Sequence, residues 1–90
     1  MRTGAVTLSS TAVLLALPET LENDRDGGRI ALEVNNAEGS ETAYIGNEDV
    51  TESTGLPIPK GETRVFPVQI GSGNKLYGVG SGDVIIAEYF

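Results

Sequence analysis

The residues of this chain best suited to chemistry are acidic, and one group has the spacing of a calcium-binding loop. Glu22, Asp24 and Asp26 alternate ahead of a glycine, and Glu33 follows Glu22 by eleven positions. In an EF-hand this spacing makes oxygen atoms converge on a hard cation. Here an arginine interrupts the loop, no helical pattern flanks it, and Glu33 falls in a predicted strand. We therefore interpret the segment as a solvated loop and expect no metal, no cofactor and no need for divalent ions in folding.

A second acidic group, Glu48, Asp49 and Glu52, lies among hydroxyl side chains. Paired carboxylates hydrolyse glycosides when a cleft holds them about 5–10 Å apart, and a 90-residue β-domain has little room for such a cleft. The chain also has no histidine and no cysteine, which removes the usual general base, Cys–His nucleophiles and thiolate or imidazole metal sites. Because no residues fill the nucleophile, base and oxyanion roles together, we predict a protein without catalytic residues, and not an enzyme.

The net charge and the length of the chain indicate which classes of partner it can bind. Thirteen acidic and six dispersed basic residues give a net charge of −7, which disfavours binding to nucleic acid and to anionic membranes. Ninety residues form one domain, 1–90, with a thin core and no disulfide to reinforce it. We therefore expect association with neighbours to add stability. The apolar run at 11–17 is too short to span a bilayer and lacks a cleavage site. We therefore predict that it is not a targeting signal.

Short strand patterns separated by glycine-rich turns predict an all-β fold, a small antiparallel β-sandwich or partly open barrel. In Arg29–Asn35, alternation points Ile30, Leu32 and Val34 inward. The apolar run Ala12–Leu17 fits a covered strand better than the alternative, a short helix, because polar residues and a proline flank it. About seven strands are predicted: Gly4–Ser9, Ala12–Leu17, Arg29–Asn35, Thr42–Gly46, Thr63–Ile70, Leu76–Val79 and Val84–Phe90.

Prolines mark the segments that belong at an edge. Residues 47–61 read as a long irregular connection in which Pro57 and Pro59 hold their neighbours extended. Since proline has no N–H to donate to a ladder, these two belong at an edge or in a loop. Pro67 likewise predicts an edge position or a bulge for its strand.

Residues 29–90 carry motifs that resemble a small β-domain of tailed-phage virion proteins, the kind found in head decoration (cement) proteins and head fibres. The matching segments are Thr42-Ala43-Tyr44-Ile45-Gly46, Asp49-Val50-Thr51, Gly55-Leu56-Pro57-Ile58, Lys60-Gly61-Glu62 and Leu76-Tyr77-Gly78-Val79, followed by Ser81-Gly82. Gly78 replaces the alanine that is commoner in the family. Residues 1–28 match less well, and we interpret them as an N-terminal arm or outer strands.

The resemblance implies a structural virion protein on the capsid surface, which binds the outside of a phage head and stabilises it. Its partner would be the major capsid protein or another virion protein. It would act as a homo-oligomer, with a trimer among the options. The alternative is a phage tail or neck protein, or a surface module that binds carbohydrate or a receptor. Such a module would hold exposed aromatics and acids together in a groove.

Two segments are the predicted partner contacts, the N-terminal segment 3–17 and the stiff loop 56–59. The contact residues named on this basis are Val6, Leu8, Val13, Leu15, Leu56, Pro57, Ile58 and Pro59. A loop that plugs one end of the sandwich is the alternative for 56–59. The aromatic end of Val84–Phe90 fits either an interface or a last strand that completes a sheet. If the N-terminal segment is an arm, deleting residues 2–9 should weaken attachment more than it lowers the melting temperature.

Overall fold

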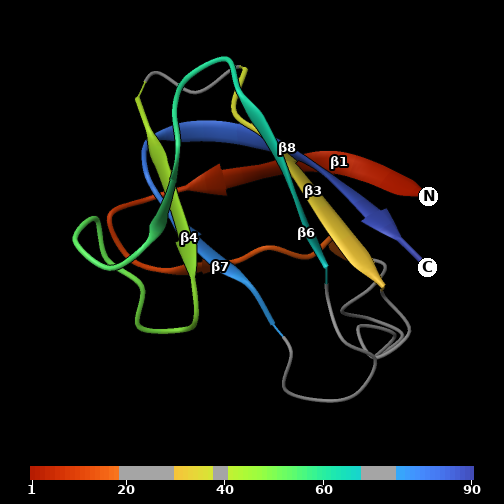
Figure 1. Cartoon of the computed structure of the whole chain (residues 1–90), viewed down its shortest axis with the longest axis horizontal. Coiled ribbons are helices and arrows are strands. Elements are labelled where there is room, and N and C mark those ends of the chain that lie inside the picture. Colours follow the sequence, from red (N-terminus) through yellow and green to blue (C-terminus); the bar gives the residue numbers. More distant parts are fainter. Residues whose placement is uncertain (19–29, 38–40, 68–74) are drawn as a thin grey trace.

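The computed structural model describes residues 1–18, 30–37, 41–67 and 75–90, and the elements within these ranges are β-strands (Figure 1). The strands are β1 (Arg2–Leu8), β2 (Val13–Leu14), β3 (Ala31–Asn35), β4 (Ala43–Gly46), β5 (Leu56–Ile58), β6 (Thr63–Pro67), β7 (Tyr77–Val79) and β8 (Gly82–Tyr89). Most of the Glu22–Glu33 segment lies outside the described residues. Of its acids, Glu33 lies in β3.

The strands form two four-stranded sheets, which confirms the predicted all-β antiparallel sandwich. The first, called sheet A, has the order β1-β8-β3-β6, and the second, sheet B, has the order β2-β7-β4-β5. All neighbouring strands within the sheets are antiparallel. The two sheets stay separate and do not close into a barrel. Both chain ends lie at the same side of the molecule, at the ends of β1 and β8 (Figure 1).

The core lies between the sheets and follows the period-two alternation of the strands. Leu32 and Val34 of β3 are fully buried, as the sequence pattern predicted, and Ala43 and Ile45 of β4 face the core while Tyr44 faces away. The buried core cluster comprises Leu8, Leu15, Leu17, Leu32, Val34, Ala43, Ile45, Ile58, Val84 and Ile86. Ile30 was wrongly placed inward. It precedes β3 and is 50% exposed.

The N-terminal residues form outer strands of the sandwich and not an extended arm. β1 pairs with β8 along all of its length, and β2 pairs with β7 at the opposite sheet. Only Val13 and Leu14 of the predicted strand Ala12–Leu17 join a ladder. Leu15, Ala16 and Leu17 follow β2 and are buried. The Leu15 N–H donates to the Leu76 carbonyl at 2.9 Å, and Leu15 and Leu17 belong to the core cluster.

Proline positions agree with the sheet order. β5, with Pro57 at its centre, is the strand absent from the sequence prediction. It forms the edge of sheet B inside what the pattern indicated as an irregular connection. β6 ends at Pro67 and forms one edge of sheet A. Both strands therefore keep the prolines away from a central ladder, where each would remove a hydrogen bond.

Candidate functional site

Among the described residues, no loop covers the outer face of sheet A, and few side chains on this face are charged. Alternation that sends one set of side chains into the core sends the other set outward, and the strand register aligns these outward residues in rows. One row runs Ala5–Ile85–Asn35–Thr63 and the next runs Thr3–Ala87–Glu33–Val65. Two of its large apolar side chains are strongly exposed, Val65 at 59% and Ile85 at 38%. The N-terminal Met1 is exposed as well, at 78%.

A shallow hollow of about 460 Å³ lies in this face. Ala87 is among its lining residues and is only 6% exposed, because its short side chain lies between the longer ones of Ile85 and Tyr89 on β8. Met1 and Thr3 line the hollow from the N-terminal end of β1. The hollow offers an apolar side chain of a partner a place to enter, the kind of feature that interface anchors use.

One polar pair borders the hollow. The Tyr89 hydroxyl donates a hydrogen bond to Oε1 of Glu33 at 3.2 Å. Desolvation of the phenol raises the pKa of Tyr89, and the neighbouring Glu33 carboxylate raises it further by charge and by accepting this hydrogen bond. The neutral phenol therefore persists to a higher pH than that of an ordinary tyrosine.

The outer face of sheet B is covered, in contrast to that of sheet A. The loop 47–55 folds back over it and buries Val50, which is 5% exposed. Two glycines permit this approach, because a Cβ at Gly46 would lie 2.8 Å from Val50 Cγ2 and one at Gly55 would lie 2.6 Å from Tyr44 Cβ. Within the loop, the Gly55 N–H donates to the Thr51 carbonyl at 2.9 Å. Only sheet A thus has its outer strand face open among the described residues.

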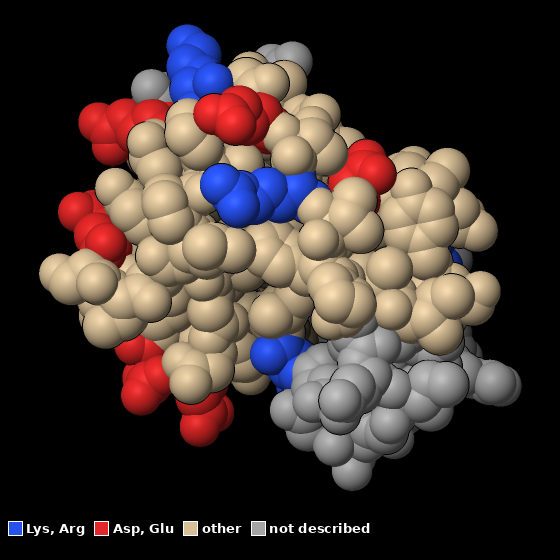
Figure 2. All heavy atoms as spheres, viewed as in Figure 1, with Lys and Arg blue, Asp and Glu red and all other residues tan. Residues whose placement is uncertain are grey.

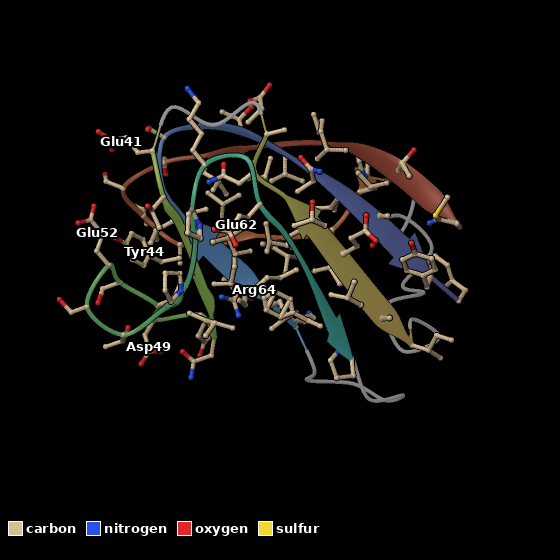
Figure 3. The ribbon with its side chains drawn as sticks, turned by 45° about the horizontal axis from the view of Figure 1, so that its top comes forward. Glu41, Tyr44, Asp49, Glu52, Glu62 and Arg64 are labelled. Atoms are coloured by element: carbon tan, nitrogen blue, oxygen red, sulfur yellow. The ribbon has the colours of Figure 1, made fainter. Side chains whose placement is uncertain are left out.

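A polar groove of about 600 Å³ lies at one end of the sandwich. Tyr44, Glu41 and Glu52 line it together with hydroxyl side chains of the β1–β2 and β7–β8 turns. Figure 3 shows Tyr44 beside Glu52, with Glu41 farther along the same flank. Acidic side chains also gather on this flank of the molecule, over β4 and the loop after it, at the left of Figure 2. The groove therefore brings an aromatic ring and two carboxylates together.

The structure separates the acidic run that the sequence grouped. Glu52 faces the polar groove, whereas Glu48 and Asp49 line a different hollow of about 440 Å³ together with Lys75 and Tyr77. Within the described ranges, no three acidic side chains lie close enough to hold a metal ion.

Three of the eight predicted contact residues belong to the core. Leu8, Leu15 and Ile58 are at most 5% exposed and pack in the core cluster, so the sandwich itself uses their apolar surface. Val6 and Val13 are partly buried against the same cluster. The remaining three are accessible to different degrees: Leu56 is 47% exposed, Pro57 is exposed and Pro59 is half-buried.

Sequence reasoning missed the outer face of sheet A as a surface. Val84, Ile85 and Ile86 follow one another, and in a strand consecutive side chains point to opposite faces. One of the three had to point outward, and this signal was present in the sequence. It is Ile85, while Val84 and Ile86 are buried. Val65 and Phe66 form a comparable apolar pair on β6, in which Val65 is exposed and Phe66 packs against the core.

No family model matches the chain, and no curated protein and no solved structure is significantly similar to it. Among the described residues, there is no helix of the length and apolar character needed to cross a bilayer.

Proposed function

We propose that this chain is a structural docking protein without catalytic activity, and that it decorates the outside of a phage head. The observation that carries the docking role is the outer face of sheet A, which no described segment covers. Ile85 lines an apolar hollow in this face, and Val65 is exposed on the same face. The assignment to a phage head, at the capsid surface, comes from the sequence motifs of residues 29–90. The major capsid protein, or another virion protein, would be the partner.

Charge indicates the chemistry of the partner surface. The chain carries a net charge of −7, and the Glu33 carboxylate lines the hollow in sheet A. A partner that presents apolar side chains to the hollow and basic side chains around them would complement both features. Binding through such a surface should weaken as the salt concentration rises. At 0.1 M salt, the attraction between exposed charges is largely screened once they are more than about 10 Å apart.

Co-sedimentation with purified heads of the phage that carries this protein tests the proposal. We expect the wild-type chain to pellet with the heads. Ile85→Asp should bind at least about tenfold more weakly, because it places a charge at the centre of the docking face. Ser53→Asp is the matched control, since it adds the same charge at an exposed site in the loop that covers sheet B.

Two results would contradict the proposal. If the wild-type chain pellets neither with heads nor with other virion components, the decoration role is wrong. If Ile85→Asp and Ser53→Asp bind equally well, docking does not use the outer face of sheet A. Circular dichroism of both variants establishes that each is folded before binding is compared.

The polar groove favours a second candidate, a surface module that binds carbohydrate. An aromatic ring with carboxylates in the same groove suits sugars, because the ring covers apolar C–H groups and the acids accept hydroxyl hydrogen bonds. Tyr44, Glu41 and Glu52 meet this requirement in one groove. Titration calorimetry with neutral oligosaccharides tests this role. Glu52→Gln should weaken any binding that uses the groove, and a lack of heat with every sugar would count against this candidate.

A further inference from the structure

Strand β1 presents a long edge with no partner strand among the described residues. It is the last strand of sheet A and pairs only with β8. In the described part of the chain, the backbone of residues 3–7 forms hydrogen bonds only in that ladder. The N–H and C=O groups that point away from β8 therefore remain available. Such a row of backbone groups is a template for pairing with another strand.

The other three edges of the sandwich are protected. β5 has Pro57 at its centre, β6 ends at Pro67, and β2 is only two residues long. Natural proteins use prolines, inserted charges, bulges and short strands to stop edges from pairing. Residues 3–7 contain no proline and no charged side chain. β1 also has no bulge, because its pairs with β8 run one to one from Arg2 to Leu8.

We propose that β1 pairs antiparallel with β1 of a second copy of this chain, about a two-fold axis at Ala5. Opposite residues in an antiparallel pair share a face. Thr3, Ala5 and Thr7 are all exposed on the same face. The register that pairs all of residues 3–7 places Ala5 opposite Ala5 of the second copy, and Thr3 opposite its Thr7. Sheet A then continues across the axis as one eight-stranded sheet, twice its four strands.

Side-chain chemistry along β1 suits a second copy. Every side chain in residues 3–7 is small or β-branched and uncharged, so two identical strands meet without like charges opposite one another. Thr3 and Thr7 form Thr–Thr pairs on both sides of the axis, a favourable cross-strand combination. The contact is closed and self-complementary, as two-fold dimers require. A strand of another protein would form backbone hydrogen bonds with this edge, but residues 3–7 offer no charged side chain that would favour it over a second copy.

Single-cysteine variants test the register directly, because the chain has no cysteine of its own. Opposite Cα atoms in antiparallel strands lie about 4.5–5.5 Å apart, within disulfide range. Ala5→Cys should therefore form a disulfide-linked dimer under mild oxidation. Thr3→Cys and Thr7→Cys should each stay monomeric alone but form a mixed disulfide together. Val65→Cys, exposed on the opposite edge strand of the same sheet, is the matched control and should not cross-link.

Sedimentation equilibrium supplies the non-covalent test. The wild-type chain should dimerise with a dissociation constant below about 1 mM, which corresponds to about −4 kcal/mol. Ala5→Lys should weaken the dimer about fivefold or more, because it places two like charges on the axis. Val65→Lys should leave it unchanged. A wild-type chain that stays monomeric up to about 1 mM overturns the proposal, and so does equal cross-linking of Ala5→Cys and Val65→Cys.

This dimer does not depend on the proposed function. Binding to phage heads is read from Ile85→Asp against Ser53→Asp, whereas dimerisation is read from variants of β1 without any partner present. If the chain dimerises but does not bind phage heads, only the decoration role is wrong. Heads that bind a strictly monomeric chain would overturn the β1 pairing alone.

Discussion

Asn36 is a buried polar residue that joins three separate segments. It is 1% exposed, and its Nδ2 donates to the carbonyls of Glu41 and Ile58, both at 2.9 Å. Its backbone N–H donates to the Glu62 carbonyl, and its carbonyl accepts from the Gly61 N–H. The end of β3 is thereby tied to the approach to β4, to β5 and to the β5–β6 turn. Buried groups of this kind hold loops in one conformation because leaving them unsatisfied is costly.

Replacing Asn36 tests this role. Asn36→Ala removes both side-chain donors and leaves two carbonyls without these partners, so we expect a loss of about 2–3 kcal/mol in the free energy of unfolding. Asn35→Ala is the neighbouring control. It removes an exposed hydrogen bond from Asn35 Nδ2 to Thr63 Oγ1 at 2.8 Å and should cost about 1 kcal/mol or less. Urea unfolding of both variants measures the difference, and equal losses would contradict the assignment.

Tyr89, which lines the hollow in sheet A, makes the stability of the fold depend on pH. Desolvation first, and then Glu33, raise the pKa of Tyr89 above its usual value of 10.0. The folded state thus holds the phenol proton more tightly than the unfolded chain does. The stability from this preference is fully present below pH 10 and is lost as pH rises through the folded-state pKa.

Phenolate absorbance during an alkaline titration measures this pKa. A Tyr89→Phe variant gives the signal of Tyr44 and Tyr77, which is subtracted from that of the wild type. The remaining signal, from Tyr89, should give a higher pKa in the folded chain than in the unfolded chain. Glu33→Gln should move its pKa down towards the usual value, because the negative charge and the charged acceptor are lost while desolvation remains. A Tyr89 pKa that does not respond to Glu33→Gln would show that the pair does not form in solution.

Among the secondary-structure elements, the two sheets differ in whether a loop covers their outer face. Sheet B is covered by the loop 47–55, whose Val50 packs close to Gly46 and Gly55. Sheet A has no comparable cover among the described residues, and its face and the β1 edge stay open. The position of one loop therefore decides which sheet remains open to a partner.

Gly55 is the residue on which the cover of sheet B depends. A Cβ there would lie 2.6 Å from Tyr44 Cβ and 3.0 Å from the Tyr44 carbonyl carbon, which is backbone and cannot move aside easily. Gly55→Ala should therefore cost about 1–3 kcal/mol. Ser53→Ala, at an exposed site of the same loop, should stay within about 0.5 kcal/mol. Thermal melting compares the two, and an unchanged Gly55→Ala would mean that the loop packs less closely.

At the scale of the whole molecule, the N-terminal strand is part of the folding unit. β1 provides Leu8 to the core cluster and seven consecutive pairs to β8. A thin domain of 90 residues has few other contacts to replace them. The prediction that deleting residues 2–9 lowers the melting temperature less than it weakens attachment assumed an arm, whereas β1 is a paired strand.

Deletion of residues 2–9 should instead abolish the cooperative thermal transition. β8 would lose its partner on one side, and the core would open beside Leu17, which packs against Gly4. Far-ultraviolet circular dichroism with a melting scan measures this. Ala5→Lys serves as the control, because it changes the edge and keeps the strand, and it should melt close to the wild type. A deletion variant that still melts cooperatively would show that β1 is dispensable.

The fold class and much of the strand pattern could be predicted from the order of the residues alone. Alternation identified Leu32 and Val34 of β3 as inward residues. Prolines predicted an edge or a bulge for β6, and an edge or a loop for the residues that form β5, because both signals are local properties of the backbone. Composition removed histidine and cysteine chemistry from consideration. The motif resemblance gave a functional hypothesis that residue chemistry alone does not supply.

Only the tertiary structure decided which apolar residues face a partner and which face the core. Leu8, Leu15 and Ile58 have the same hydrophobicity as exposed Leu56 or Ile85, and their burial depends on which strands pair and which sheet lies opposite. Pairing joins residues as distant as Thr3 and Ala87. No local pattern contains that information, because the free energy of burying a side chain depends on the neighbours that the whole fold brings to it.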